Sequence, residues 1–150
     1  MFSKNGGAAT GSSRLQQTGE MAMAEWGEVQ KHMRANYSLQ NDDGEMFSVV
    51  WSYDDGRSQK IIVRRYMSND RVMVEFKSPF AKRGQIDPEA LLRQNSQMTL
   101  ATIALSGDVV LAIYNLLLDS ASIDDVEYVL RRVASIADAL EAEYAGGDVF

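Results

Sequence analysis

Apolar residues between positions 20 and 37 recur at the three- and four-residue spacing of an amphipathic helix. The residues that share this face are Ala22, Trp26, Val29 and Met33. Gly27 interrupts the pattern and weakens such a helix by about 1 kcal/mol relative to alanine, without breaking the stripe. We therefore predict a helix over 20–37, and the run Asn41-Asp42-Asp43-Gly44 predicts the turn that follows it.

The next segment changes to the two-residue alternation that is typical of β-strands. Three runs carry it, at 45–53, 59–67 and 71–77, and short polar turns separate them. We expect the third run to end at Ser78-Pro79, because proline has no backbone N–H to donate to a strand partner. The shortness of the connections favours an antiparallel meander.

A short helix, a hairpin and a long helix are predicted for the C-terminal half. The first helix begins after Asp87, with proline at its first position, and reaches about Asn95. Strands at 98–105 and 109–118 are joined through Ser106-Gly107-Asp108, and a capping-box-like start at Ser122 opens a helix that reaches about Tyr144. The predicted order is α-β-β-β-α-β-β-α, an α+β fold on an antiparallel sheet of about five strands.

Composition divides the chain into one domain and two terminal segments. Residues 1–19 are rich in glycine and serine and lack acidic residues, so we expect a disordered tail; a transit peptide is the alternative, but arginine is scarce. Residues 20–145 are expected to form a single α+β domain, since a chain of 150 residues can bury about 70% of its unfolded surface without disulfides. Residues 146–150 are expected to be a flexible C-terminus.

Composition also excludes several classes of function. The chain has no cysteine, which excludes thiol catalysis and thiolate metal sites and fits a reducing compartment. The net charge of −6 argues against a nucleic-acid binder, which usually carries a basic patch. No membrane span is expected, because the longest apolar run, 109–118, is far shorter than the roughly 20 residues that a spanning helix needs.

No combination of residues predicts catalysis, a cofactor or a metal site. His32 is the only histidine and lies beside the apolar stripe of the first helix, so a metal site there would lack further imidazole or thiolate ligands. The acidic runs at 42–45 and 54–56 lack the alternating twelve-residue pattern of a calcium-binding EF-hand loop, and turn chemistry explains them. No histidine or lysine is placed to activate a serine. We therefore expect a protein that is not an enzyme.

Surplus apolar surface in the strands is the feature that favours binding. In 109–118, apolar residues occupy both odd and even positions, whereas a half-exposed antiparallel sheet alternates apolar with polar residues. Either the helices divide between the two faces and bury everything, or one face stays open for a second copy or a partner. The candidate partner-contact residues under the second interpretation are Met46, Val50, Met73, Val110 and Tyr114.

The order of elements and several local patterns resemble the type III secretion chaperone-like superfamily, which includes the Tir/CesT chaperones and the YbjN-like proteins. The resemblance covers about residues 20–145 and rests on Leu91 to Asn95, Leu100 to Leu105, Gly107-Asp108, Val109-Val110-Leu111 and the capped helix from Asp119 to Leu140. The segments closer to the YbjN-like branch are Gly56-Arg57-Ser58-Gln59 and Ser78-Pro79.

This resemblance implies a small, acidic, cytoplasmic and usually homodimeric protein without catalytic residues. Secretion chaperones of this fold bind an extended segment of a client along apolar patches, and YbjN-like members are described as regulators. The expected function is a protein-binding module that buries apolar segments of a partner, with strand addition at a sheet edge as one route. The alternative is a small-molecule-binding or enzymatic domain of unrecognised type, which would need a pocket with converging polar groups.

Overall fold

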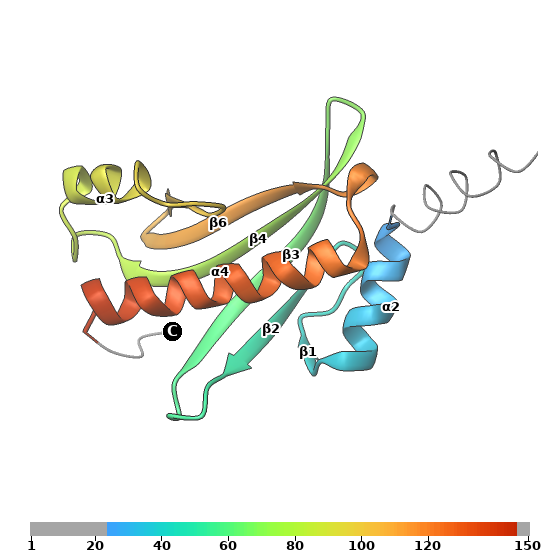
Figure 1. Ribbon diagram of the computed structural model, residues 1–150, viewed down its shortest axis with the longest axis horizontal. Helices are drawn as coiled ribbons and strands as arrows, with labels where there is room; N and C mark the ends of the chain where they lie inside the picture. The colour runs from blue at the N-terminus through green and yellow to red at the C-terminus, as the bar shows by residue number, and fades with distance from the viewer. Residues whose placement is uncertain (1–23, 147–150) are drawn as a thin grey trace, which may run out of the picture.

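One long helix lies across a six-stranded antiparallel sheet (Figure 1). The structure, a computed structural model, describes residues 24–146. The helices are α2 (Trp26–Asn36), α3 (Pro88–Asn95), α4 (Ile123–Tyr144) and the short 3-10 helix η1 (Leu118–Ser120). The strands are β1 (Leu39–Gln40), β2 (Met46–Ser52), β3 (Ser58–Ser68), β4 (Arg71–Lys82), β5 (Thr102–Ser106) and β6 (Val109–Leu117). Their order in the sheet is β1-β2-β3-β4-β6-β5.

The predicted α+β fold is confirmed, with one strand more than expected. Strand β1 pairs with β2 through Leu39 and Gln40, and two residues are too few to produce a periodic signal in the sequence. Helix α2 begins at Trp26 rather than at residue 20, with Glu25 as the residue that precedes its first turn. The predicted N-terminal tail and the last four residues lie outside the described part of the chain.

The prediction that the third long strand ends at Ser78-Pro79 is wrong. Strand β4 continues through Pro79 to Lys82, and its register with β6 shifts between Pro79 and Ala81. The reason is that β3 pairs with β4 only as far as Ile62 opposite Lys77. Beyond that point β4 has a ladder partner on one side only, and a proline at an edge or bulge costs little because no N–H is required there.

Local capping explains where the two C-terminal helices begin. Ser122 Oγ accepts a hydrogen bond from the Asp125 N–H at 3.1 Å, and Asp125 Oδ2 accepts one from the Ser122 N–H at 2.8 Å, which is the predicted capping box. Asp87 accepts from the Glu89 N–H ahead of α3. Gly146, the second residue after the end of α4, takes a positive φ of 70°, a conformation that glycine adopts without a steric penalty.

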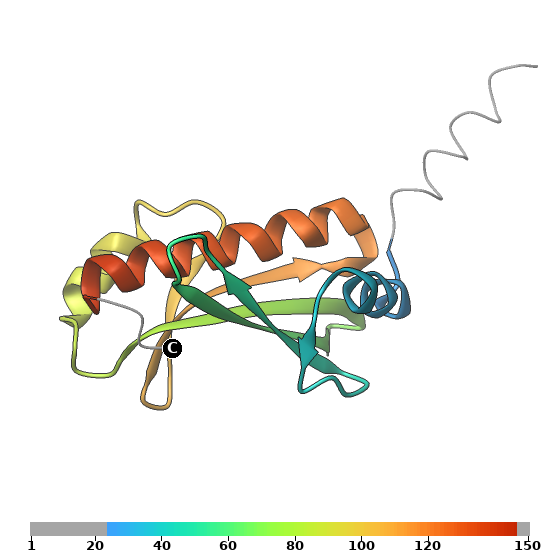
Figure 2. The same ribbon diagram turned by 90° about the horizontal axis from the view of Figure 1, so that it is seen from below.

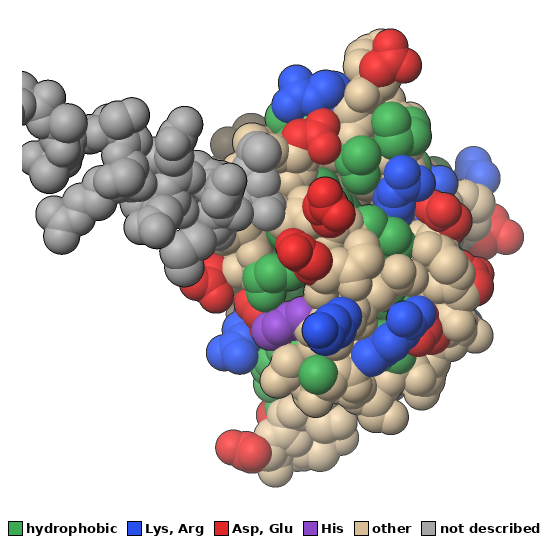
Figure 3. Space-filling model, turned by 90° about the vertical axis from the view of Figure 1, so that its right-hand side faces the viewer, with side chains coloured by type: hydrophobic (Ala, Val, Ile, Leu, Met, Phe, Trp, Pro, Cys, Tyr) green, Lys and Arg blue, Asp and Glu red, His purple; other side chains and the backbone are tan. Residues whose placement is uncertain are grey.

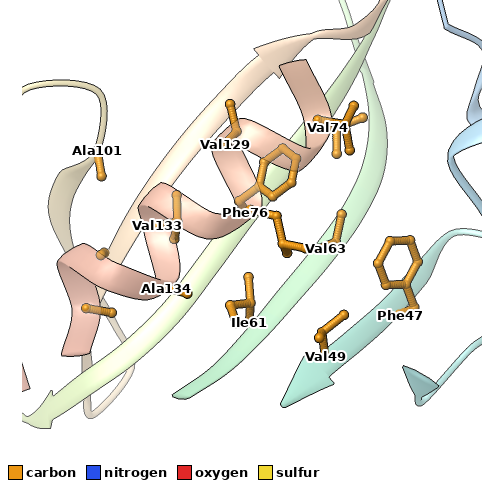
Figure 4. Packing of buried hydrophobic residues seen from close by; sticks show 14 of the residues in the cluster. Phe47, Val49, Ile61, Val63, Val74, Phe76, Ala101, Val129, Val133 and Ala134 are labelled. Carbon is orange, nitrogen blue, oxygen red and sulfur yellow. The ribbon is translucent and has the colours of Figure 1, made fainter. Parts of the chain in front are cut away.

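The core lies between α4 and the sheet face that it covers (Figure 4). The buried side chains of α4 are Val126, Val129, Leu130, Val133, Ala134, Ala137, Leu140 and Glu141. Opposite them, β3 contributes Ile61 and Val63, and β4 contributes Val74 and Phe76, all without exposed surface. Each large aliphatic or aromatic side chain buried there stabilises the fold by about 1.5–3 kcal/mol, so this layer fixes which sheet face points inward.

Helix α2 joins the same core at one end of α4. Its buried residues are Val29 and Met33, and the ring of Trp26 stacks on Phe47 of β2 with 5.7 Å between centroids. Helix α3 lies at the other end of the sheet, beside the edge strand β5 (Figure 1). The α-helices of residues 24–146 therefore lie at one face or at the ends of the sheet.

Candidate interaction surface

The second face of the sheet has no helix over it within residues 24–146 (Figure 2). Because side chains alternate along a strand, Met46 and Val50 of β2 point away from buried Phe47 and Val49 and toward this face. Met73 of β4 lies on the same side, since it alternates with buried Val74. We call this surface the open face; its other members include Ile62, Tyr66, Leu111, Ile113 and Leu117.

Three of the five predicted contact residues lie on the open face, and two do not. Met46 and Met73 are partly buried there, and Val50 is 40% exposed. Val110 and Tyr114 lie on the helix-covered face, because Tyr114 pairs with Phe76 of the core and Val110, four residues earlier in β6, points to the same side. Val110 is only 4% exposed and Tyr114 is partly buried, so neither belongs to the open face.

The open face carries charge as well as apolar surface. Arg64 Nη2 and Lys77 Nζ both contact Glu75 Oε1, at 3.3 and 3.1 Å. Lys60 has no ion pair with any described residue. Tyr66 donates a hydrogen bond to Asn115 Oδ1 at 2.8 Å across the face. Arg64 and Lys77 therefore share one carboxylate, and Lys60 has none among the described residues, so the local charge is positive on a chain whose net charge is −6.

A hollow of about 260 Å³ lies in the open face where β3 and β4 separate. Its lining residues are Ile62, Lys77, Pro79, Ser106, Val109 and Leu111. The two strands do not form a ladder past this point, and side chains join them instead: Gln59 Nε2 donates to Ser78 Oγ at 2.9 Å and to the Pro79 carbonyl at 2.7 Å. Ser78 Oγ in turn donates to the Lys60 carbonyl at 2.6 Å.

A second hollow, of about 320 Å³, separates α3 from β5. Its lining is mainly aliphatic and includes Ile86, Leu91, Ile103 and Val110, with Arg83 as its charged residue. We call it the α3–β5 groove. Leu92 and Leu105 also line it and remain 69% and 55% exposed, so the groove has apolar side chains that face solvent.

The edge of β5 is partly closed to strand addition. The Asn95 side chain donates from Nδ2 to the Ile103 carbonyl at 3.1 Å, and its Oδ1 accepts from the Ile103 N–H at 2.5 Å. One side chain thus satisfies both outward backbone groups of Ile103, as a neighbouring strand would. Covering an edge in this way blocks sheet extension at that residue.

A polar cluster that the sequence did not indicate joins α2 to α4. Glu127 of α4 accepts a hydrogen bond from the Tyr37 hydroxyl at 2.6 Å, and its other carboxylate oxygen lies 2.7 Å from His32 Nε2. Arg131 contacts the same carboxylate at 3.5 Å and its guanidinium lies over the Trp51 ring. Figure 3 looks onto this end of the molecule, where the histidine sits among acidic and basic side chains.

Burial and hydrogen bonding shift the pKa values within this cluster. Burial, together with the hydrogen bond to Glu127 and the charge of its carboxylate, raises the pKa of Tyr37 to about 12. Burial alone would raise the pKa of Glu127, but hydrogen bonds from Tyr37 and His32 and the charges of His32 and Arg131 outweigh it and hold the pKa below 4.5. Glu127 is therefore an ionised anchor between two helices, and the cluster acts as a structural tether.

No family model matches the chain, and the search of curated proteins found no match. In the described part of the chain, no helix is long and apolar enough to cross a membrane. The same residues contain no group of three or more histidine, cysteine, aspartate or glutamate side chains arranged to hold a metal ion.

Proposed function

We propose that this chain is a non-enzymatic protein-binding module of the type III secretion chaperone-like kind, closer to its YbjN-like branch. It would act in the cytoplasm as a homodimer that buries apolar segments of a partner protein. The observation that carries the proposal is the asymmetry of the sheet: α4 covers one face, and within residues 24–146 no helix lies over the apolar side chains of the other face. A contiguous uncovered apolar surface on a protein is typical of an interaction site.

The open face is the surface on which we place the partner. Val50 and the partly buried Met46 and Met73 supply apolar contact area, and methionine adapts its shape to different partners. Side-chain docking fits this face better than strand addition, because the Gln59 and Ser78 side chains occupy the gap between β3 and β4.

The α3–β5 groove is the surface on which we place the second copy. A twofold dimer needs a surface patch that is complementary to itself. The α3–β5 groove meets this need because it combines a hollow with protruding side chains. Leu92 and Leu105, both more than half exposed, stand beside the aliphatic groove that would receive the same residues of the other copy. Asn95 blocks ladder formation at Ile103, so packing of side chains is the route that remains.

Light scattering after size-exclusion chromatography tests the dimer. The full chain should elute at twice its mass, and Leu92→Asp combined with Leu105→Asp should give a folded monomer, because each buries a charge in an apolar contact. Tyr128→Asp is the matched control, since Tyr128 is 59% exposed on α4 and lies outside the groove. A wild-type monomer, or a double variant that remains a dimer, would contradict this part of the proposal.

A further inference from the structure

The hollow of the open face combines an aliphatic wall with lysine side chains at its margin. Ile62, Pro79, Val109 and Leu111 form the apolar wall, and Lys77 contributes to the lining. A volume of about 260 Å³ suits an apolar side chain with part of its backbone rather than a drug-sized ligand, whose pockets begin at about 300 Å³.

Lys60 and Lys77 stand on either side of Ile62. Ile62 is paired with Lys77 across the β3–β4 ladder, and Lys60 is two residues from Ile62 on the same side of β3. The β3–β4 ladder ends at the Ile62–Lys77 pair, so Lys60 lies on the part of β3 that borders the separation of the two strands. Both ammonium groups can therefore reach residues that flank an apolar side chain seated in the hollow.

The charges of this face are not balanced within the described residues. Lys60, Arg64 and Lys77 bring three positive charges and Glu75 brings one negative charge, which leaves +2. Glu75 is shared by Arg64 and Lys77, and Lys60 has no carboxylate of its own among residues 24–146. A partner that supplies carboxylates would complete these pairs and would also be steered toward this face.

We infer that the hollow of the open face binds a partner polypeptide segment in which an apolar residue is flanked by acidic residues. The apolar side chain enters the space between Ile62, Pro79 and Leu111, and carboxylates on either side pair with Lys60 and Lys77. This inference rests on the proposed function and deepens it, because it gives the partner a chemistry that can be tested.

A polypeptide fits this site better than a nucleic acid does. Single-stranded nucleic acid binds to aromatic side chains on which bases stack, along a continuous basic groove. Apart from Lys77 and Ser106, the lining of the hollow is aliphatic, and it contains no aromatic side chain on which a base could stack. A short peptide segment can carry an apolar side chain that fits the aliphatic hollow and carboxylates that pair with the lysines.

Fluorescence anisotropy with labelled peptides tests the inference on the full chain. The probe contains a central Leu-Phe-Leu flanked on both sides by Glu-Glu, and two comparison peptides replace every glutamate by glutamine or by lysine. A single-stranded oligonucleotide of similar length is the fourth probe. The acidic peptide should bind at least ten times more tightly than the lysine peptide at low ionic strength, and added salt should narrow the difference.

Two variants report separately on charge and on the hollow. Lys60→Glu should weaken the acidic peptide by about fivefold to tenfold, as expected for reversing one exposed pair. Ser106→Trp should weaken it at least tenfold by filling the hollow from an exposed position at the end of β5. Lys31→Glu is the matched control, because Lys31 is an exposed lysine on α2, and it should leave affinity within twofold of wild type.

Three other results would overturn the inference, and each would indicate a different property of the open face. Equal binding of all three peptides, lost in Ser106→Trp, would remove the acidic requirement while leaving a protein-binding module in place. Tighter binding of the oligonucleotide, lost in Lys60→Glu, would assign the face to nucleic acid. If no peptide binds, the inference is overturned. Light scattering would still decide separately whether the chain forms a dimer through the α3–β5 groove.

Discussion

Replacing Glu127 by alanine should destabilise the protein by about 2–3 kcal/mol, because the carboxylate holds α2 against α4. Glu127 receives the Tyr37 hydroxyl at 2.6 Å and lies 2.7 Å from His32 Nε2. A hydrogen bond to a charged group contributes about 1.5–3 kcal/mol, and we take the lower end for each of the two because the cluster is only partly buried. The more distant contact with Arg131, at 3.5 Å, is given little weight.

Thermal unfolding followed by circular dichroism measures this loss. For a domain of this size, 1 kcal/mol corresponds to about 4 °C, so Glu127→Ala should melt about 8–12 °C below wild type. Glu143→Ala removes an exposed acid near the end of the same helix and should change the melting temperature by less than about 2 °C. If Glu127→Ala melts within about 2 °C of wild type, the tether between α2 and α4 does not stabilise the fold.

The same variant has a defined pH dependence. The pKa of Glu127 is held below its ordinary value of 4.5 in the folded protein. A lowered carboxylate pKa adds stability that is fully present above the unfolded pKa and is lost as the pH falls through the folded pKa. The Glu127 carboxylate makes wild type more stable than Glu127→Ala. This difference in the free energy of unfolding should therefore shrink once the pH falls below about 4.5.

Two further predictions concern the polar side chains that close gaps in the sheet. Asn95→Ala should lower the free energy of unfolding by about 2 kcal/mol in urea titrations, because both outward backbone groups of Ile103 lose their partner; an unchanged midpoint would refute the role of Asn95. Gln59→Ala should cost about 2–4 kcal/mol through lost hydrogen bonds and a cavity, whereas Gln59→Leu should cost less than half of that. The difference arises because leucine fills the space and removes the buried Gln59 Oε1, which has no partner in the described part of the chain, and equal losses would contradict it.

The sequence predicted those elements whose signals are local. The Ser122 capping box, the proline at the start of α3 and the Gly107-Asp108 turn each depend on a few adjacent residues, and each is present in the structure. The end of β4 was mispredicted because proline in a strand is unfavourable only where a ladder partner needs its N–H, and pairing with β3 is a non-local fact.

The open face was anticipated, but its residues were only partly identified. Apolar residues on both sides of 109–118 indicated surplus surface, yet alternation alone does not tell which side α4 covers. Val110 and Tyr114 were named as candidates for this reason, and they lie on the side that α4 covers. The tether at Glu127 was missed because its members are about 90 residues apart in the chain, and no spacing rule connects α2 to α4.

Cysteine labelling measures most directly whether the open face is a protein-binding surface. The chain has no cysteine, so Val50→Cys on the open face and Tyr128→Cys on the outside of α4 each give one reactive thiol at an exposed position. The tagged protein is isolated under mild conditions from the cells in which it is native and is labelled with a maleimide, before and after bound proteins are removed at high salt. We predict slow labelling at position 50 that becomes fast after removal, with fast labelling at position 128 throughout. Equal labelling at both positions before and after removal would contradict the central claim.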